Sequence, residues 1–261
     1  MSDESMALTG LLGILSVAFF ALVLLCIEGG RRIGNRDTRV GDTNASGLGP
    51  VEASIFGLMG LLIAFTFSGA AERLDTRRTL IVDETNAIGT AWLRLDLLPT
   101  ADAQAIRPMF RRYVDRRIDY FEDVFDSERR ASEDRTLSET QRELWNRTVI
   151  AVQGMAVPAL GSPVVQAMND MFDIATTRNS ALAMHPPYVV YGMLVLLELI
   201  SALLIGFGMA ANQQRMWMHC IGYALVMTAV LYVIIDFEMP RAGMIRVDAF
   251  DKLLIELRQS L

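Results

Sequence analysis

Hydrophobic and charged positions occupy separate blocks along this chain of 261 residues. Charged side chains are almost absent from four apolar segments, at 6–27, 53–71, 186–211 and 216–235, and they are dense between 72 and 147. About twenty helical residues span the hydrocarbon core of a bilayer, so each apolar segment is long enough to cross it. The pattern predicts an all-α integral membrane protein, with four transmembrane helices in two pairs and a large helical extramembrane domain between the pairs.

The same blocks predict the organisation of the chain. In order, we expect an N-terminus and first transmembrane helix at 1–27, a connecting loop at 28–49, a second transmembrane helix at 50–71, a charged helical domain at 72–185, a third transmembrane helix at 186–211, a fourth at 216–237, and an amphipathic tail at 238–261. The link between the third and fourth helices is short, which predicts antiparallel neighbours.

The second apolar segment continues into the charged domain without a helix breaker until Pro99. Its continuation repeats an apolar residue every seven positions and a mixed residue between the repeats, which predicts one long helix with a packed seam. The apolar positions are Leu74, Ile81, Ile88 and Leu95, and the alternate ones are Arg78, Thr85 and Trp92.

Three more helices are predicted in the charged domain. The first covers 102–127 and has one largely apolar face, a charged connection follows at 128–135, a second helix begins at the capping pattern of 136–141, and the third starts at Ser162. The face of the first helix comprises Ile106, Phe110, Tyr113, Arg117, Phe121 and Val124.

Charge and composition exclude several classes of function. A net charge of −6 gives no basic surface for nucleic acid. Both cysteines, Cys26 and Cys220, lie in apolar segments, which favours neither disulfides nor metal binding. The two histidines, His185 and His219, are separated by a membrane segment, and no catalytic or cofactor motif is present. The sequence predicts no enzyme, no cofactor and no metal.

Arginines near the membrane boundaries give the expected orientation. A cytoplasmic domain places Arg73, Arg77, Arg78 and Arg178 inside, where cations are enriched, although the first loop carries further arginines that favour the opposite. We predict a multi-pass protein of the cell membrane with a cytoplasmic domain.

One face of the second segment carries Gly57, Leu61 and Phe65 four residues apart, flanked by Leu58 and Leu62. Its glycines are typical of close helix packing in membranes. The alternative is a ring of apolar side chains around an axis, which forms a constriction that gates by dewetting.

Carboxylates within or beside the membrane segments are further candidates. Glu198 lies in the middle of the third segment, where it either stays protonated and hydrogen-bonded to Ser201, Ser68 or Thr66, or takes part in ion passage or interhelical bonding. Four carboxylates at membrane boundaries either reach water or form charged rings at a pore mouth. They are Glu28, Glu52, Asp236 and Glu238.

The stretches at 60–78 and 83–94, followed by 96–99 and 111–114, resemble a bacterial family of unknown function described as bestrophin-like. That family is distantly similar to bestrophins, which are homopentameric anion channels. The resemblance implies a homo-oligomeric channel for inorganic anions such as chloride in the bacterial inner membrane. It places a hydrophobic neck on Gly57, Leu61 and Phe65.

The same resemblance places Arg73, Arg77 and Arg78 around the inner mouth, where they attract anions. The chain departs from the bestrophin pattern at Thr66, where bestrophins have an arginine, and at 72–75, where they have paired aromatic residues. The alternative function is a non-conducting membrane scaffold or sensor whose helical domain binds a protein partner.

Overall fold

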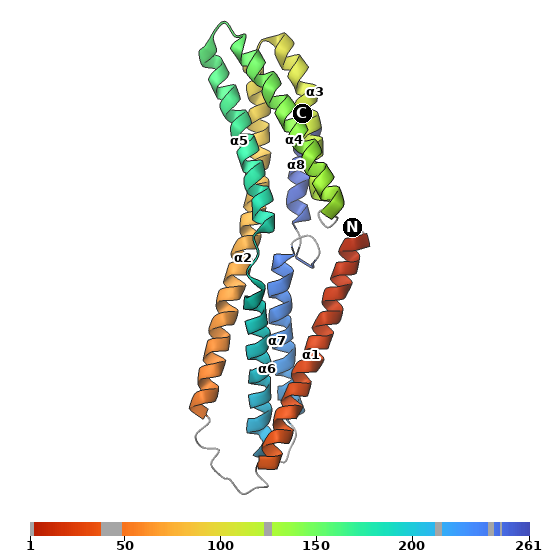
Figure 1. The fold of residues 1–261 in the computed structure, drawn as a ribbon, viewed down its shortest axis with the longest axis vertical. Coiled ribbons are helices and arrows are strands. Elements are labelled where there is room, and N and C mark those ends of the chain that lie inside the picture. The colour runs from red at the N-terminus through yellow and green to blue at the C-terminus, as the bar shows by residue number, and fades with distance from the viewer. Residues whose placement is uncertain (1–2, 38–48, 123–126, 212–215, 240–242, 246) are drawn as a thin grey trace. The chain divides into compact units, whose positions relative to one another are not determined.

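In the computed structural model, the described residues are 3–37, 49–122, 127–211, 216–239, 243–245 and 247–261. Their regular elements are all helical (Figure 1). The α-helices are α1 (Asp3–Asp37), α2 (Gly49–Arg94), α3 (Thr100–Glu122), α4 (Ser127–Gln153), α5 (Pro158–Ala183), α6 (Tyr188–Gly208), α7 (Trp217–Glu238) and α8 (Asp248–Ser260), and two short 3₁₀ helices are η3 (Leu95–Leu97) and η4 (Met209–Ala211).

The chain divides into two compact units. The extramembrane unit comprises Met1–Ser5, Asp75–Met184 and Arg246–Leu261, and the membrane unit comprises Met6–Leu74 and His185–Ile245. Four stretches of helix are long and apolar enough to cross a bilayer, at Met6–Arg36, Gly49–Leu97, Pro158–Gly208 and Trp217–Glu238. The predicted all-α membrane class with four spans is therefore confirmed.

Helix boundaries differ from the predictions at three places. Helix α1 continues to Asp37, ten residues beyond the expected end, and its glycines remain helical. Helix α4 begins at Ser127, so the whole charged stretch at 128–135 that was predicted as a connection is helical. Helix α5 begins at Pro158, four residues before the predicted start at Ser162, because a proline at the first helical position lacks an N–H that would have no partner there.

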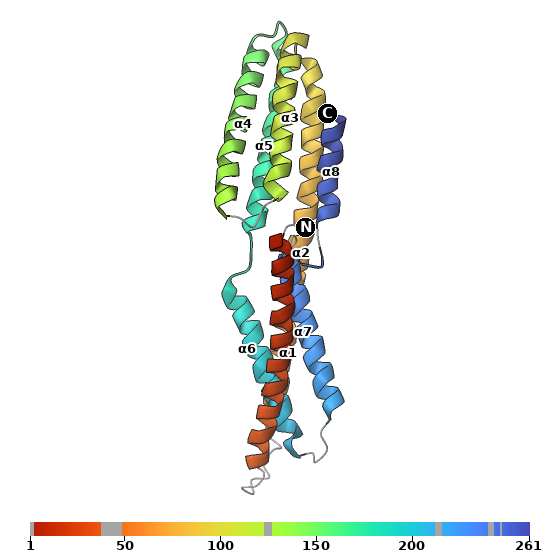
Figure 2. The same ribbon diagram turned by 90° about the vertical axis from the view of Figure 1, so that its right-hand side faces the viewer.

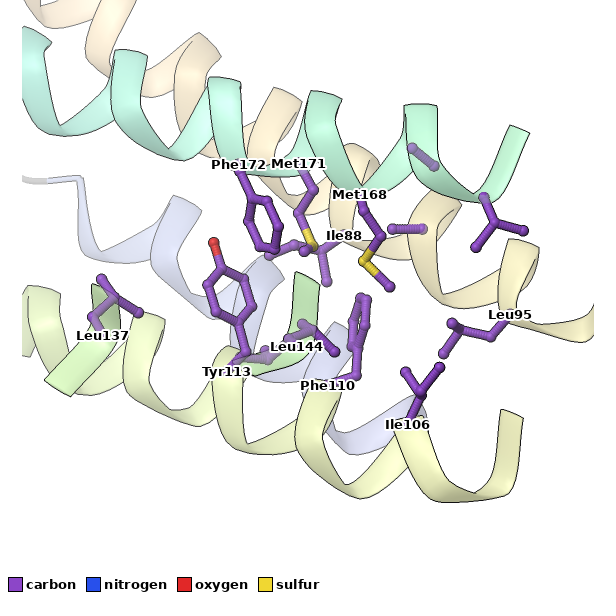
Figure 3. Packing of buried hydrophobic residues seen from close by; sticks show 14 of the residues in the cluster. Ile88, Leu95, Ile106, Phe110, Tyr113, Leu137, Leu144, Met168, Met171 and Phe172 are labelled. Carbon is purple, nitrogen blue, oxygen red and sulfur yellow. The ribbon is translucent and has the colours of Figure 1, made fainter. Parts of the chain in front are cut away.

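Large side chains fill the core of the extramembrane unit. Figure 2 shows α3, α4, α5 and α8 running alongside the second half of α2, and Figure 3 shows Phe110 and Tyr113 of α3 facing Met168 and Phe172 of α5. The Tyr113 and Phe172 rings meet edge to face, with centroids 5.4 Å apart.

The predicted packing faces are confirmed as buried. All four apolar seam positions of α2 are buried, from Leu74 to Leu95, and Ile88 and Leu95 lie in this core. The apolar face of α3 is buried from Ile106 to Phe121, including the cationic Arg117. Val124, the last residue of that predicted face, lies outside the described residues.

Small residues hold the membrane unit together at the crossing of α1 and α6. A Cβ atom added to Gly30 would lie 1.9 Å from the Leu203 carbonyl oxygen, and one added to Gly206 would lie 1.9 Å from that of Ile27. Glycine is required at both positions because the two backbones touch. Beside this crossing, Val23 and Ala202 form a small apolar cluster with α7 residues.

Candidate functional site

The face of α2 that carries the predicted neck is open to its surroundings in the protomer. Leu61 is 53% exposed and Phe65 is 68% exposed. Cβ atoms built on Gly57 and Gly60 meet nothing within 4 Å, so these glycines do not serve a close helix contact within the chain. Leu58 is also exposed, whereas Leu62 is half-buried.

The opposite face of α2 packs inside the membrane unit. Met59, Thr66 and Ala70 are buried there, and the Phe67 ring lies 5.5 Å from the ring of Phe237 on α7. The Thr66 hydroxyl donates to the Leu62 carbonyl oxygen, one turn back on the same helix. Helix α2 thus has a packed side and an uncovered side within one chain.

The three arginines predicted at the inner mouth have other partners. Arg73 donates from Nε to Glu238 Oε1 at 2.8 Å, and the buried Arg77 donates to the carbonyl oxygens of Ala181 and Met184. The guanidinium of Arg78 lies 5.7 Å from the centre of the Phe250 ring. Each of these positive charges is therefore partly or fully engaged within its own unit.

Glu198 of α6 is a buried carboxylate of the membrane unit. It is 4% exposed, and its Oε1 atom has no hydrogen-bond partner among the described residues. The hydroxyl of Ser201, one turn later, is fully buried and lies near Tyr223 of α7. Of its other predicted partners, Thr66 bonds within its own helix and Ser68 is exposed.

The four boundary carboxylates have different environments. Glu28 forms an exposed ion pair with Arg32 at 3.2 Å, and Glu52 is half-buried in the first turn of α2. Asp236 is buried and accepts hydrogen bonds from the backbone N–H groups of Met244 and Ile245, at 2.8 and 2.9 Å. These bonds fix the turn that follows α7.

Glu238, the fourth boundary carboxylate, is buried between two partners. Besides its pair with Arg73, its Oε2 atom lies 3.3 Å from Nδ1 of His185. Asp236 and Glu238 thus have specific partners inside the membrane unit, an arrangement that the sequence analysis did not foresee.

A buried ion network ties four helices of the extramembrane unit together. Glu84 of α2 is fully buried and accepts from Arg117 Nε of α3 at 2.5 Å and from Arg178 of α5 at 2.7 Å. Arg178 also donates to Asp251 of α8 at 2.8 Å, and its guanidinium stacks on the ring of Phe121.

Electrostatics favour the charged forms in this network. Burial by itself raises the pKa of Glu84, but attraction and hydrogen bonds from Arg117 and Arg178 outweigh it, so the pKa lies below its usual value. Burial likewise lowers the pKa of Arg117, and the charge of Glu84 reverses that effect. Asp83, the neighbour of Glu84, is exposed, and no group of metal-binding side chains occurs among the described residues.

Comparison with known sequences agrees with this architecture. The Bestrophin-like domain family matches residues 17–249, which is most of the chain. The chain belongs to the Bestrophin-like family. Comparison with curated proteins and with solved structures found no match.

The Bestrophin-like match includes the uncovered face of α2, Glu198 and three members of the Glu84 network, and it ends within the first residues of α8, before Asp251. Two features of this family member were missed by sequence analysis. The glycine crossing of α1 and α6 was missed because Gly30 stands next to charged residues and was assigned to a loop. Arg178 was considered only as a membrane-boundary charge, although it follows Met171 by seven residues and Ala175 by three, a spacing that places it on the buried side of α5.

Proposed function

We propose that this Bestrophin-like chain assembles into a homo-oligomeric ion channel in which α2 lines a hydrophobic neck, with a pentamer as the expected assembly. The observation that carries the proposal is the uncovered face of α2, where large apolar side chains and open glycines lie in one row. An apolar ring around an axis narrows a pore and repels water, which gives a gate without any charged group.

Anions are the expected permeant ions, and family membership is the support for this choice. The neck itself is apolar, and the arginines assigned to the mouth are engaged elsewhere. We keep the extramembrane unit on the cytoplasmic side of the cell membrane, as the boundary arginines predict. The partners of the chain are then the bilayer, further copies of itself and inorganic anions.

The test is single-channel recording from the purified full chain in planar bilayers. Phe65→Ala widens the proposed neck, so we expect a several-fold rise in unitary conductance. Phe67→Ala is the matched control, because Phe67 lies two positions away and packs on Phe237. It should leave conductance unchanged and lower stability.

Reversal potentials under a salt gradient identify the permeant ion. A shift toward the chloride equilibrium potential supports anion conduction, and a shift toward the cation potential contradicts it. Silent bilayers from a correctly assembled oligomer would reject the channel and favour a non-conducting scaffold or sensor.

A further inference from the structure

The membrane unit contains a polar site on the packed side of α2. The Oε1 atom of Glu198 on α6 is buried there without a hydrogen-bond partner among the described residues, and the buried hydroxyl of Ser201 lies one turn later, near Tyr223 of α7. The Tyr223 side chain of α7 interacts electrostatically with Glu198, and its hydroxyl lies 4.0 Å from the sulfur of Met59 on α2. Three helices therefore meet around one carboxyl group.

Charge balance restricts what this site holds. An ionised carboxylate at membrane depth is costly unless a cation or strong donors compensate it. Tyr223 is the titratable group of α7 that acts on Glu198, and the described part of the chain gives no such interaction from α1 or α2. A positive ligand must therefore neutralise the site.

The number of oxygen atoms decides between a proton and a metal cation. Hard metal cations such as Ca²⁺ or Mg²⁺ take about six or more oxygen ligands. Three oxygen-bearing side chains meet here, those of Glu198, Ser201 and Tyr223, which is too few. A proton needs a single carboxylate oxygen, and the resulting hydroxyl has the buried Ser201 oxygen one turn away on the same helix.

We propose that Glu198 is a proton-binding site of the membrane unit and that its charge state acts on α2 through Tyr223 and Met59. Met59 and Leu61 are two positions apart, about 200° around the helix axis, so the site lies behind the proposed neck. Loss of the proton leaves a charge in an apolar packing layer and loosens the contact that holds α2. The effect on α2 rests on the proposed channel function, whereas proton binding does not.

Infrared difference spectroscopy of the full chain in lipid vesicles tests proton binding directly. The wild type should show a carbonyl band of a buried protonated carboxyl that disappears as the pH is raised. Glu198→Gln should remove the band completely, and Glu28→Gln, at an exposed ion pair, should keep it. A band that persists in Glu198→Gln would overturn the proposal.

A second variant covers the case in which Glu198→Gln fails to assemble. Tyr223→Phe keeps the carboxyl but removes the nearby hydroxyl, so we expect the titration midpoint of the band to move to more alkaline pH. An unmoved midpoint contradicts the assigned site. Replacement of choline by sodium in the vesicles should not shift the wild-type midpoint, and a shift would show that a metal cation competes for the site and overturn the assignment to a proton.

Ion flux measured in the same vesicles tests the effect on α2. The wild-type flux should change with pH, and the flux of Glu198→Gln should lose that dependence while conduction persists. An unchanged pH dependence in Glu198→Gln overturns the coupling. Absence of flux at every pH, with the infrared band present, instead rejects the channel function and supports the proton site.

Discussion

Two buried glutamates, one in each unit of the molecule, have different environments. Glu84 in the extramembrane unit is fully buried and accepts hydrogen bonds from two arginines. Glu198 in the membrane unit is almost as buried and has no charged partner among the described residues. The first site keeps its negative charge by pairing, and the second is the site that we propose binds a proton. The same residue type thus serves as a structural crosslink in one unit and as a candidate ligand site in the other.

The two units also differ in the size of the side chains through which their helices pack. The extramembrane core contains aromatic rings and long side chains, such as Phe110 and Met168. In the membrane unit, α1 and α6 approach through Gly30 and Gly206 until their backbones touch. In the extramembrane unit, the hydrophobic effect drives the burial of large side chains. In lipid this driving force between helices is absent, so close van der Waals contact between α1 and α6 stabilises their packing.

The largest effect is expected from breaking the paired glutamate. Glu84→Gln leaves Arg117 buried without a carboxylate partner and leaves Arg178 with Asp251 as its remaining carboxylate, so we expect a loss of about 3–5 kcal/mol in the free energy of unfolding. Urea titration of the full chain in detergent, followed by tryptophan fluorescence, measures this change because Trp92 and Trp145 pack against the extramembrane core.

Asp83→Asn is the matched control for Glu84→Gln. Asp83 precedes Glu84 on α2 and is exposed, so its free energy of unfolding should stay within about 0.5 kcal/mol of the wild type. If the two variants are equally stable, the buried network is not what ties α2 to α3 and α5.

A smaller effect is expected at the glycine crossing. In Gly206→Ala the new methyl group has no room beside the Ile27 carbonyl, and the helices must separate, at a cost of about 1–3 kcal/mol. Gly192→Ala on the same helix is the control, since its added Cβ meets nothing within 4 Å. Unfolding by SDS titration, followed by circular dichroism, compares them, and equal stability would contradict close packing of α1 on α6.

These sites show what the sequence could predict. The four membrane spans followed from the length of the apolar segments. The seam from Leu74 to Leu95 followed from periodicity, because apolar repeats report which face of a helix is buried. The burial of Arg117 could be predicted for the same reason. Its ion-pair partner, Glu84, could not be predicted, because a pair between residues 33 positions apart depends on how the helices cross.

The candidate site was predictable only in part. The row of Gly57, Leu61 and Phe65 could be identified by its spacing, but whether α2 turned this face inward or outward was open until packing placed Met59 and Thr66 inside. The arginines beyond the row looked available for anions because charge counts carry no information about local partners. The contact of Arg73 with Glu238 joins residues 165 positions apart.

The pH dependence of the free energy of unfolding is expected to give the smallest effect per pH unit. It also compares Glu84 with Glu198 most directly. The folded-state pKa of Glu84 lies below its unfolded value, which is about 4.3 for a free glutamate. Below that pH the unfolded chain binds a proton that the folded chain does not, so the stabilisation from the network is present above the unfolded pKa and is lost as the pH falls through the folded pKa. The slope from this one group is at most about 1.4 kcal/mol per pH unit. Urea titrations at a series of acid pH values should show it in the wild type and lose this component in Glu84→Gln, whereas Glu198→Gln should retain it, because that substitution leaves the Glu84 network intact. An identical acid dependence in the wild type and Glu84→Gln would mean that the pKa of Glu84 is the same in the folded and unfolded chains, and the contrast between a paired charge and a bound proton would then fail.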